Sequence, residues 1–109
     1  MSTSASDIAQ ALAKEVKVTR DELRVVLSDG RTIAAPLAWY PRLLHGTSEE
    51  RGTWRLIGRG TGIHWEVLDE DISVEGLLAG LPSGESQESL KKWLNAREKR
   101  IINRSKRRR

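Results

Sequence analysis

The sequence predicts an α+β fold: a small antiparallel sheet of two β-hairpins packed with short helices, plus a basic C-terminal helix. Two stretches show the alternating apolar period of half-buried strands, and each surrounds a turn that contains glycine. Segments with helical spacing follow each hairpin, and a long helical pattern closes the chain. Basic residues are concentrated after residue 90, where ten Lys or Arg and one Glu give a net charge of +9, whereas residues 1–90 carry −5.

The length of 109 residues fits one ordinary domain. We expect a weakly ordered N-terminal helix in 1–15, an α+β core in 16–82, and a basic helix and tail in 83–109. The absence of cysteine excludes disulfides and thiolate metal sites. No apolar run approaches the roughly 20 residues that cross a bilayer, and no basic signal region precedes the core. We therefore expect a cytoplasmic protein without a membrane partner.

The predicted elements follow from local patterns. The helix in 6–15 rests on Ile8, Ala11 and Leu12 at helical spacing, and a short strand follows around 16–18. The first hairpin centres on Asp29-Gly30, a dipeptide that tolerates the positive φ of a tight turn.

A segment with helical spacing then covers 37–44, interrupted by Pro41 unless the helix begins there. Thr47 and Ser48 have the side chains of helix N-caps and predict one further turn. The second hairpin covers 54–67 around "GRGTG", which lacks the lysine and the following helix of a phosphate-binding loop. Ser73 caps a short helix, and a longer helix runs from Ser86 to about residue 102.

Four carboxylates surround a histidine in the stretch "HWEVLDED", residues 64–71. We interpret Asp69 and Asp71 as residues of a strand-to-helix turn, because adjacent side chains point in different directions on regular backbone. A partner-facing acidic patch and a metal or acid–base site remain alternatives. His64 and Glu66 share a strand face, but no nucleophile accompanies them, so we expect no catalytic residue, no metal and no cofactor.

Two groups of residues are candidates for binding. Trp39, Tyr40 and Arg42 combine flat amphipathic rings with a guanidinium, a mixture typical of interface hot spots, although core packing is the alternative for the rings. The second group is the basic tail. It would bind nucleic acid, with an affinity that falls steeply with salt, or it would bind an acidic protein. The remaining alternative is that the tail is solvated and binds neither. It consists of Lys91, Lys92, Lys99, Arg100, Arg104, Lys106, Arg107, Arg108 and Arg109.

The stretches "PLAWYPRLL", "WRLIGRGTGIHWEVLDEDISVEGLLAG" and "ESLKKWL" resemble a family of small prokaryotic proteins known as domain of unknown function 2442. In relatives the Trp at position 65 is often followed by Pro, where this chain has Glu66, so that position is not essential chemistry. The resemblance implies a small α+β domain. It also implies frequent placement in toxin–antitoxin-like gene pairs, and some members carry an added helix-turn-helix. It implies no catalytic residues.

These observations favour a non-enzymatic binding or regulatory module of the antitoxin-like kind, which recognises another small protein. The alternative is a nucleic-acid-binding regulator that uses the basic C-terminal tail on DNA or RNA.

Overall fold

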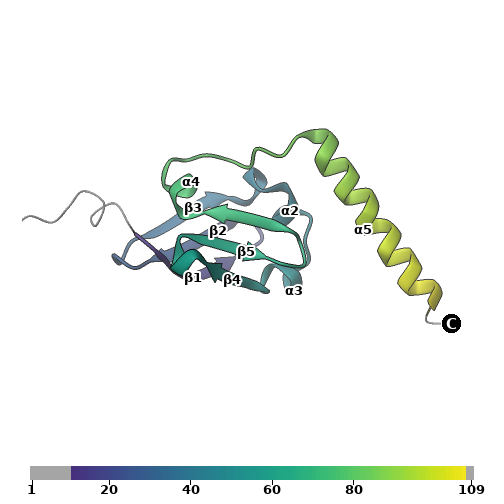
Figure 1. Cartoon of the computed structure of the whole chain (residues 1–109), viewed down its shortest axis with the longest axis horizontal. Coiled ribbons are helices and arrows are strands. Elements are labelled where there is room, and N and C mark those ends of the chain that lie inside the picture. Colours follow the sequence, from purple (N-terminus) through teal and green to yellow (C-terminus); the bar gives the residue numbers. More distant parts are fainter. Residues whose placement is uncertain (1–10, 108–109) are drawn as a thin grey trace, which may run out of the picture.

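Two three-stranded antiparallel sheets form the body of the protein (Figure 1). The computed structural model describes residues 11–107, with side chains to Asn103. The first sheet contains β1 (Ala13–Val18), β2 (Glu22–Leu27) and β3 (Thr32–Pro36), and the second contains β4 (Trp54–Ile57), β5 (Gly62–Trp65) and β6 (Glu70–Ser73). The α+β class is confirmed, but the single sheet that we expected is divided into two. The strand expected around 16–18 is part of β1, whereas β6 is an additional strand beside the second hairpin.

The first sheet contains the predicted hairpin. Val25 pairs with Ile33 across it, and the amide of Leu27 donates to the carbonyl of Arg31 over 2.8 Å. Gly30 has a φ of +93° in the turn, a conformation that glycine adopts without strain. Asp29 accepts from the amide and from the side chain of Arg31, so the turn is fixed by its own side chains.

The second sheet shows that residues 69–71 do not form the strand-to-helix turn that we expected. Residues 66–69 turn between two strands, and Asp71 lies within β6, where it pairs with His64 of β5. Asp69 occupies the turn with a φ of +50°, which aspartate tolerates better than most residues. The strand was missed because a four-residue segment with three polar residues lacks an apolar period. The helix α4 (Val74–Leu78) begins only after it, with Ser73 accepting from the amide of Gly76 as predicted.

Buried residues of both sheets belong to one hydrophobic core. Leu23, Val25 and Leu27 come from the first sheet, and Ile63 and Trp65 come from the second; all are at most 1% exposed. Burying five large apolar side chains contributes about 1.5–3 kcal/mol each before the entropic cost of folding. This shared core positions the surface elements described below.

Close backbone approach also joins the sheets. Gly60 lies in the short 3-10 helix η2 (Gly58–Gly60) and has a φ of +96°. A Cβ at this position would lie 2.8 Å from the carbonyl oxygen of Ala13 in β1. The "GRGTG" stretch therefore connects two strands, as predicted, and its third residue must be small.

Three short helical elements follow the first sheet. The 3-10 helix η1 (Leu37–Trp39) is followed by α2 (Pro41–Leu44), with proline at its first position, and by α3 (Ser48–Arg51). Thr47 and Glu50 form a reciprocal capping box at the start of α3. The predicted N-caps at Thr47 and Ser73 are thus both present.

The predicted N-terminal helix is wrong where the structure describes it. Residues 1–10 lie outside the described part, but residues 13–15 belong to β1 rather than to a helix. Ala13 and Val16 are buried in the core, so tertiary packing decides the conformation of a segment whose apolar spacing fits a helix equally well.

The helix α5 (Gln87–Arg107) projects away from the body (Figure 1). The principal extents are 68 × 26 × 23 Å and the radius of gyration is 16.4 Å, against about 13 Å for a compact chain of 100 residues. The helix continues five residues beyond the end that we expected. None of the described helices is long and apolar enough to cross a membrane.

Candidate functional site

The predicted aromatic site divides between the surface and the core. Trp39 is 37% exposed, whereas Tyr40 is 3% exposed and belongs to the core. Tyr40 is therefore not part of an exposed surface, because it packs among the buried residues of the hydrophobic core. Whether Trp39 contacts a partner stays a prediction.

Arg42 is occupied by contacts within the chain. Its Nε donates to Glu85 over 2.9 Å, its Nη2 lies 2.5 Å from Glu85 Oε2, and its Nη1 donates to the carbonyl of Asp69 over 2.9 Å. The Arg42 side chain is 15% exposed and that of Glu85 9%. The Arg42 guanidinium lowers the pKa of Glu85. These contacts fix the loop that leads to α5.

Trp93 anchors the first half of α5. Its ring is partly buried against the core, and two guanidinium groups lie over it. The Arg42 Cζ is 5.2 Å and the Arg97 Cζ 5.4 Å from the ring centroid. Cation–π contacts at such distances contribute about 0.5–2 kcal/mol, and more when they are desolvated.

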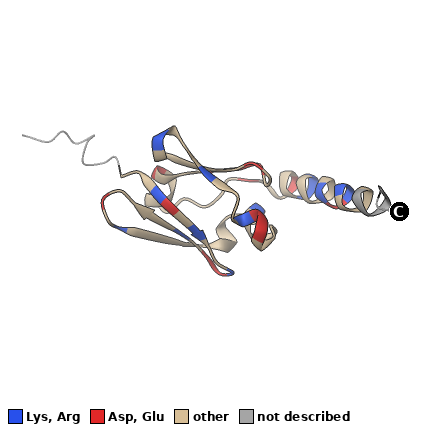
Figure 2. Cartoon of the chain, turned by 90° about the horizontal axis from the view of Figure 1, so that it is seen from below, with Lys and Arg blue, Asp and Glu red and all other residues tan. Residues whose placement is uncertain are grey.

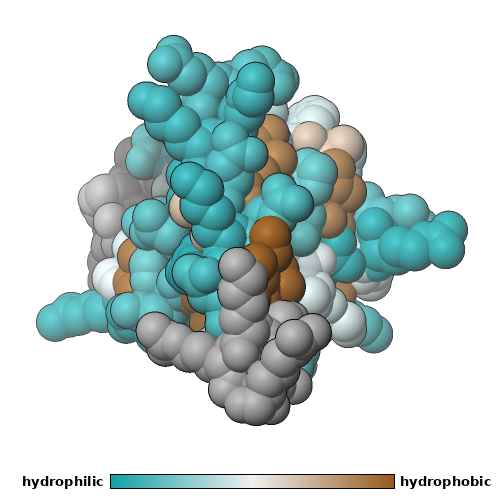
Figure 3. Space-filling view, turned by 90° about the vertical axis from the view of Figure 1, so that its right-hand side faces the viewer, coloured by the Kyte–Doolittle hydropathy of each residue, from teal (hydrophilic) through white to brown (hydrophobic). Residues whose placement is uncertain are grey.

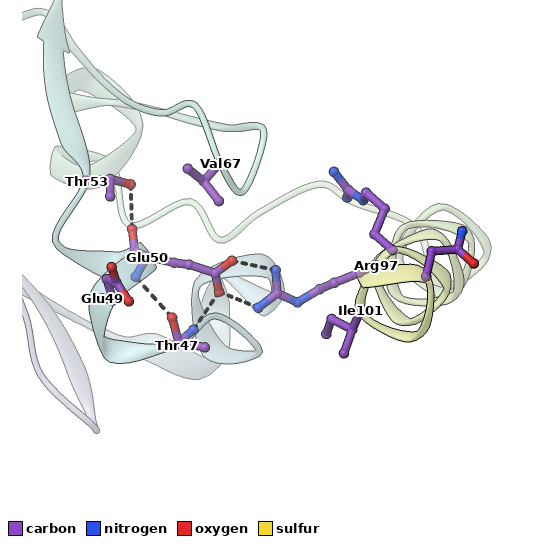
Figure 4. A pocket seen from close by; sticks show the side chains of 9 residues that line it. Thr47, Glu49, Glu50, Thr53, Val67, Arg97 and Ile101 are labelled. Atoms are coloured by element: carbon purple, nitrogen blue, oxygen red, sulfur yellow. Dashed lines mark hydrogen bonds and ion pairs between the residues drawn. The ribbon is translucent and has the colours of Figure 1, made fainter. Parts of the chain in front are cut away.

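A second contact joins α5 to α3. Arg97 forms a bidentate ion pair with Glu50, with Nη1 and Oε2 separated by 2.8 Å, and both side chains are less than 20% exposed. The hydrogen bonds from Arg97 are the main reason that the pKa of Glu50 falls to about 2, with the Thr47 amide adding to the effect. Glu50 thus holds α5 while its Oε1 also accepts from the Thr47 amide over 2.8 Å (Figure 4).

Beside this ion pair, α5 and the body enclose an open groove with a volume of about 640 Å³. We call it the arm groove. Val67, from the turn before β6, and Ile101, from α5, leave apolar surface on its two walls, with exposures of 49% and 57% (Figure 4). Figure 3 shows apolar surface next to the polar helix at this end of the molecule. The remaining lining residues are Thr47, Glu49, Glu50, Thr53, Arg97, Arg100 and Asn103.

We call Lys91–Arg107 of α5 the basic arm. Lys91, Lys92, Lys99 and Arg100 are all exposed, and Figure 2 shows the blue positions of Lys and Arg repeated along the projecting helix. Arg104, Lys106 and Arg107 belong to the helix by their backbone, and Arg108 and Arg109 lie outside the described residues. The structure therefore places seven of the nine predicted basic residues on one projecting helix, four of them with exposed side chains, and what they bind stays a prediction.

His64 lies between two carboxylates on the second sheet. Its Nδ1 contacts Asp71, and its Nε2 lies 3.1 Å from Glu66 Oε2. The hydrogen bond with Asp71 is the largest reason that the pKa of His64 is raised, and Glu66 adds to it. Asp69, which we had grouped with them, points elsewhere with 86% of its side chain exposed. Among residues 11–103 no group of three or more His, Asp or Glu side chains could hold a metal ion.

A model of the family described as protein of unknown function DUF2442 matches residues 13–83. The chain belongs to this family. The matched region contains both sheets and α4, and α5 lies after it. The resemblance that the sequence suggested is therefore confirmed.

Two solved structures share the fold. A protein of unknown function from Rhodospirillum rubrum is 29% identical, with a TM-score of 0.62, and the match covers 72% of this chain and 96% of that one. An uncharacterized protein from Chromobacterium violaceum is 20% identical, with a TM-score of 0.58 and 74% coverage of each chain. The second shows likeness of fold alone. No curated protein matches the sequence.

Proposed function

We propose that this DUF2442 protein is a non-enzymatic binding module that recognises a protein partner, as the regulatory or antitoxin-like half of a two-gene pair. The arm groove is the observation that carries the proposal. Val67 and Ile101 face the same open space from the body and from α5, and both are about half exposed. Apolar residues grouped in a concave surface are typical of sites that receive a partner.

Charge indicates which partner segment fits the arm groove. Arg100 lies on the α5 wall without a resolved acidic partner among the described residues, and Lys99 precedes it. A partner helix with one apolar face and acidic residues beside it would cover Val67 and Ile101 and would neutralise the arm. A second copy of the arm is a poor occupant, because two segments of high positive charge repel one another.

Two adjacent isoleucines provide a matched test. Ile101 lines the arm groove, whereas Ile102 does not line it although it is also exposed, at 47%. We would measure binding of the full chain to the product of the neighbouring gene by calorimetry. Ile101→Ser should weaken binding about tenfold, and Ile102→Ser should leave it unchanged, because a central apolar contact contributes about 1–2 kcal/mol.

Equal affinities for Ile101→Ser and the unchanged chain would contradict the arm-groove site, and failure of any complex to form would remove the proposed partner. Trp39→Ala belongs in the same series. A loss of affinity in the Trp39→Ala variant would indicate that the partner contacts the exposed surface around Trp39.

A nucleic-acid-binding role is the second candidate, favoured by the four exposed basic residues on one projecting helix. Binding of a labelled duplex should then weaken steeply with salt, with a log–log slope of about −0.9 for each phosphate contacted. The double change Lys99→Gln and Arg100→Gln should reduce that slope by about 2. Absence of binding at low salt would end this alternative.

A further inference from the structure

A second cavity lies between β6, α4 and the loop that leads to α5, and it shares no residue with the arm groove. Its volume is about 570 Å³. Tyr40 and Glu70 line it, and within the described residues the buried Tyr40 hydroxyl and the buried Glu70 Oε2 have no hydrogen-bond partner, whereas Glu70 Oε1 accepts from the Asp71 amide. Tyr40 is 97% buried, because its exposure is 3%. Orphaned polar atoms of this kind cost about 1–3 kcal/mol each, so two of them in one cavity call for an explanation.

The charges around the cavity define what could supply the missing partner. Four acidic residues, Asp69, Glu70, Asp71 and Glu85, and one basic residue, Arg42, line the cavity. The Asp69 side chain is 86% exposed and Glu85 is paired with Arg42, so Glu70 is the acid of interest. Arg42 directs its hydrogen bonds to Glu85 and to the carbonyl of Asp69, so it donates none to Glu70. Asp71 has His64 as a partner on the other side of β6. Among the side chains that the structure describes, Glu70 therefore has no cationic hydrogen-bond donor of its own.

The walls add an apolar component. Ile72 and Leu77 are buried along one side, and Leu81 and Pro82 form part of the rim, with Leu81 61% exposed. A short alkyl stem can lie against this rim while a polar head group reaches the floor. The combination of the Glu70 carboxylate and an apolar rim complements an amphipathic cation.

We propose that this cavity binds a primary ammonium or guanidinium group carried on a short apolar stem, with Glu70 as its counter-ion and the Tyr40 hydroxyl as a second hydrogen-bond partner. Both oxygens are buried and belong to residues that line the cavity, so contact with the head group requires the Glu70 side chain to rotate toward it. The same chemistry is offered by a free alkylamine and by a lysine or arginine side chain of another protein.

The ionisation of Glu70 gives the measurement. Burial raises the pKa of Glu70 to about 6, and the pKa of Tyr40 is raised by burial and by the neighbouring charge of Glu70. A bound cation stabilises the carboxylate and must lower the pKa of Glu70 toward its ordinary value. We would follow the Glu70 carboxyl carbon and the Tyr40 ring by NMR in the full chain.

Three probes are titrated: butylammonium, butylguanidinium and Nα-acetyl-lysine N-methylamide, with butyrate as the matched anion on the same stem. The cations should shift both signals saturably and lower the pKa of Glu70, and butyrate should do neither. Stronger binding of the lysine derivative than of butylammonium would identify a protein side chain as the source, and the reverse order would identify a free amine.

Two nearly isosteric variants and one control complete the test. Glu70→Gln should weaken the cations at least about tenfold, and Tyr40→Phe, which keeps the ring in the core, by several-fold, because the hydrogen bonds that each variant removes are made to a charged group. Glu15→Gln, an exposed acid on β1, should change nothing. Equal affinity in Glu70→Gln, or no saturable shift in the unchanged chain, would overturn the proposal. So would a crystal grown with probe in which only a water bridges Tyr40 and Glu70.

Discussion

Glu50 and Glu70 have opposite environments. Glu50 receives a guanidinium and a backbone amide, and its pKa falls to about 2, chiefly through Arg97. Glu70 is partly buried and has no cationic hydrogen-bond donor in the described part of the chain, and its pKa rises to about 6. Because one carboxylate is stabilised by folding and the other is destabilised, the two contribute to the pH dependence of stability with opposite signs.

Glu70→Gln should stabilise the protein at neutral pH. The folded pKa of Glu70 is above the ordinary value of 4.5, so its ionisation costs stability as pH rises from about 4.5 through 6. Removing the charge should abolish that cost above pH 6 and make little difference at pH 4. Urea unfolding at both pH values measures the difference, and a variant less stable than the original chain at pH 7 would contradict this assignment.

Glu50→Gln should change the pH dependence of stability in the opposite direction. The folded pKa of Glu50 is lowered, so its contribution is present above pH 4.5 and is lost as pH falls toward 2. The variant should be less stable by about 1–3 kcal/mol at pH 7, and the difference should diminish in acid. Glu49→Gln is the control, since Glu49 is exposed and has no resolved side-chain partner in the described region. A loss that persists unchanged at pH 2 would indicate a cause other than the ion pair.

At the scale of elements, local patterns identified the first hairpin, the two N-caps and the long helix. These turns and caps depend on properties of the residues that form them, namely Asp29-Gly30, Thr47 and Ser73. They can therefore be predicted from the sequence alone. β1 and β6 were not fully predictable because their conformation depends on partners. Ala13 pairs with Leu27 and Asp71 with His64, and neither contact has a local signal.

The same limit applies to the candidate sites. The basic arm was evident from charge, whereas the Glu50–Arg97 pair joins residues 47 positions apart and the Tyr40–Glu70 cavity joins two separate elements. The one available signal was the position of Arg97 at helical spacing among the apolar residues Leu90, Trp93, Leu94 and Ile101. A cation at a contact position indicates an acidic or aromatic partner, and the structure supplies both.

Two glycines test how closely the sheets approach. Gly30 and Gly60 both have φ above +90°, but only at Gly60 would an added Cβ lie within 3 Å of a backbone atom. Gly30→Ala should cost about 1–2 kcal/mol through backbone strain alone. Gly60→Ala should cost about 1–3 kcal/mol more, because β1 must move. Thermal or urea unfolding compares them, and equal losses would show that the contact with Ala13 contributes nothing.

At the scale of the whole molecule, an acidic body carries a projecting basic helix. Residues 1–90 have a net charge of −5 and residues 91–109 have +9, yet the principal extent of 68 Å shows that the helix does not fold back over the body. Within the described residues, Trp93, Arg97 and their neighbours attach it. The rest of the positive charge described along α5 is left exposed, which keeps it available to a partner.

Arg97→Met should release the arm, whereas Arg100→Met should not. Arg97 has both Glu50 and Trp93 as partners, and Arg100 is exposed. Loss of the partly buried pair should broaden the distribution of dimensions in small-angle X-ray scattering and increase amide exchange in residues 87–103. An identical scattering profile for both variants would show that Trp93 alone is sufficient to hold the helix.

Because Glu50 contacts both α5 and the start of α3, movement of the basic arm should change the fluorescence of a buried tryptophan. The carboxylate that holds Arg97 also closes the start of α3, and the last residue of that helix, Arg51, offers its carbonyl to the indole nitrogen of Trp65 over 3.0 Å. Displacing α5 therefore loosens the segment that fixes a buried fluorophore. Emission from a chain in which Trp39 and Trp54 are replaced, and Trp93 is kept because it anchors α5, should therefore change when the helix is displaced.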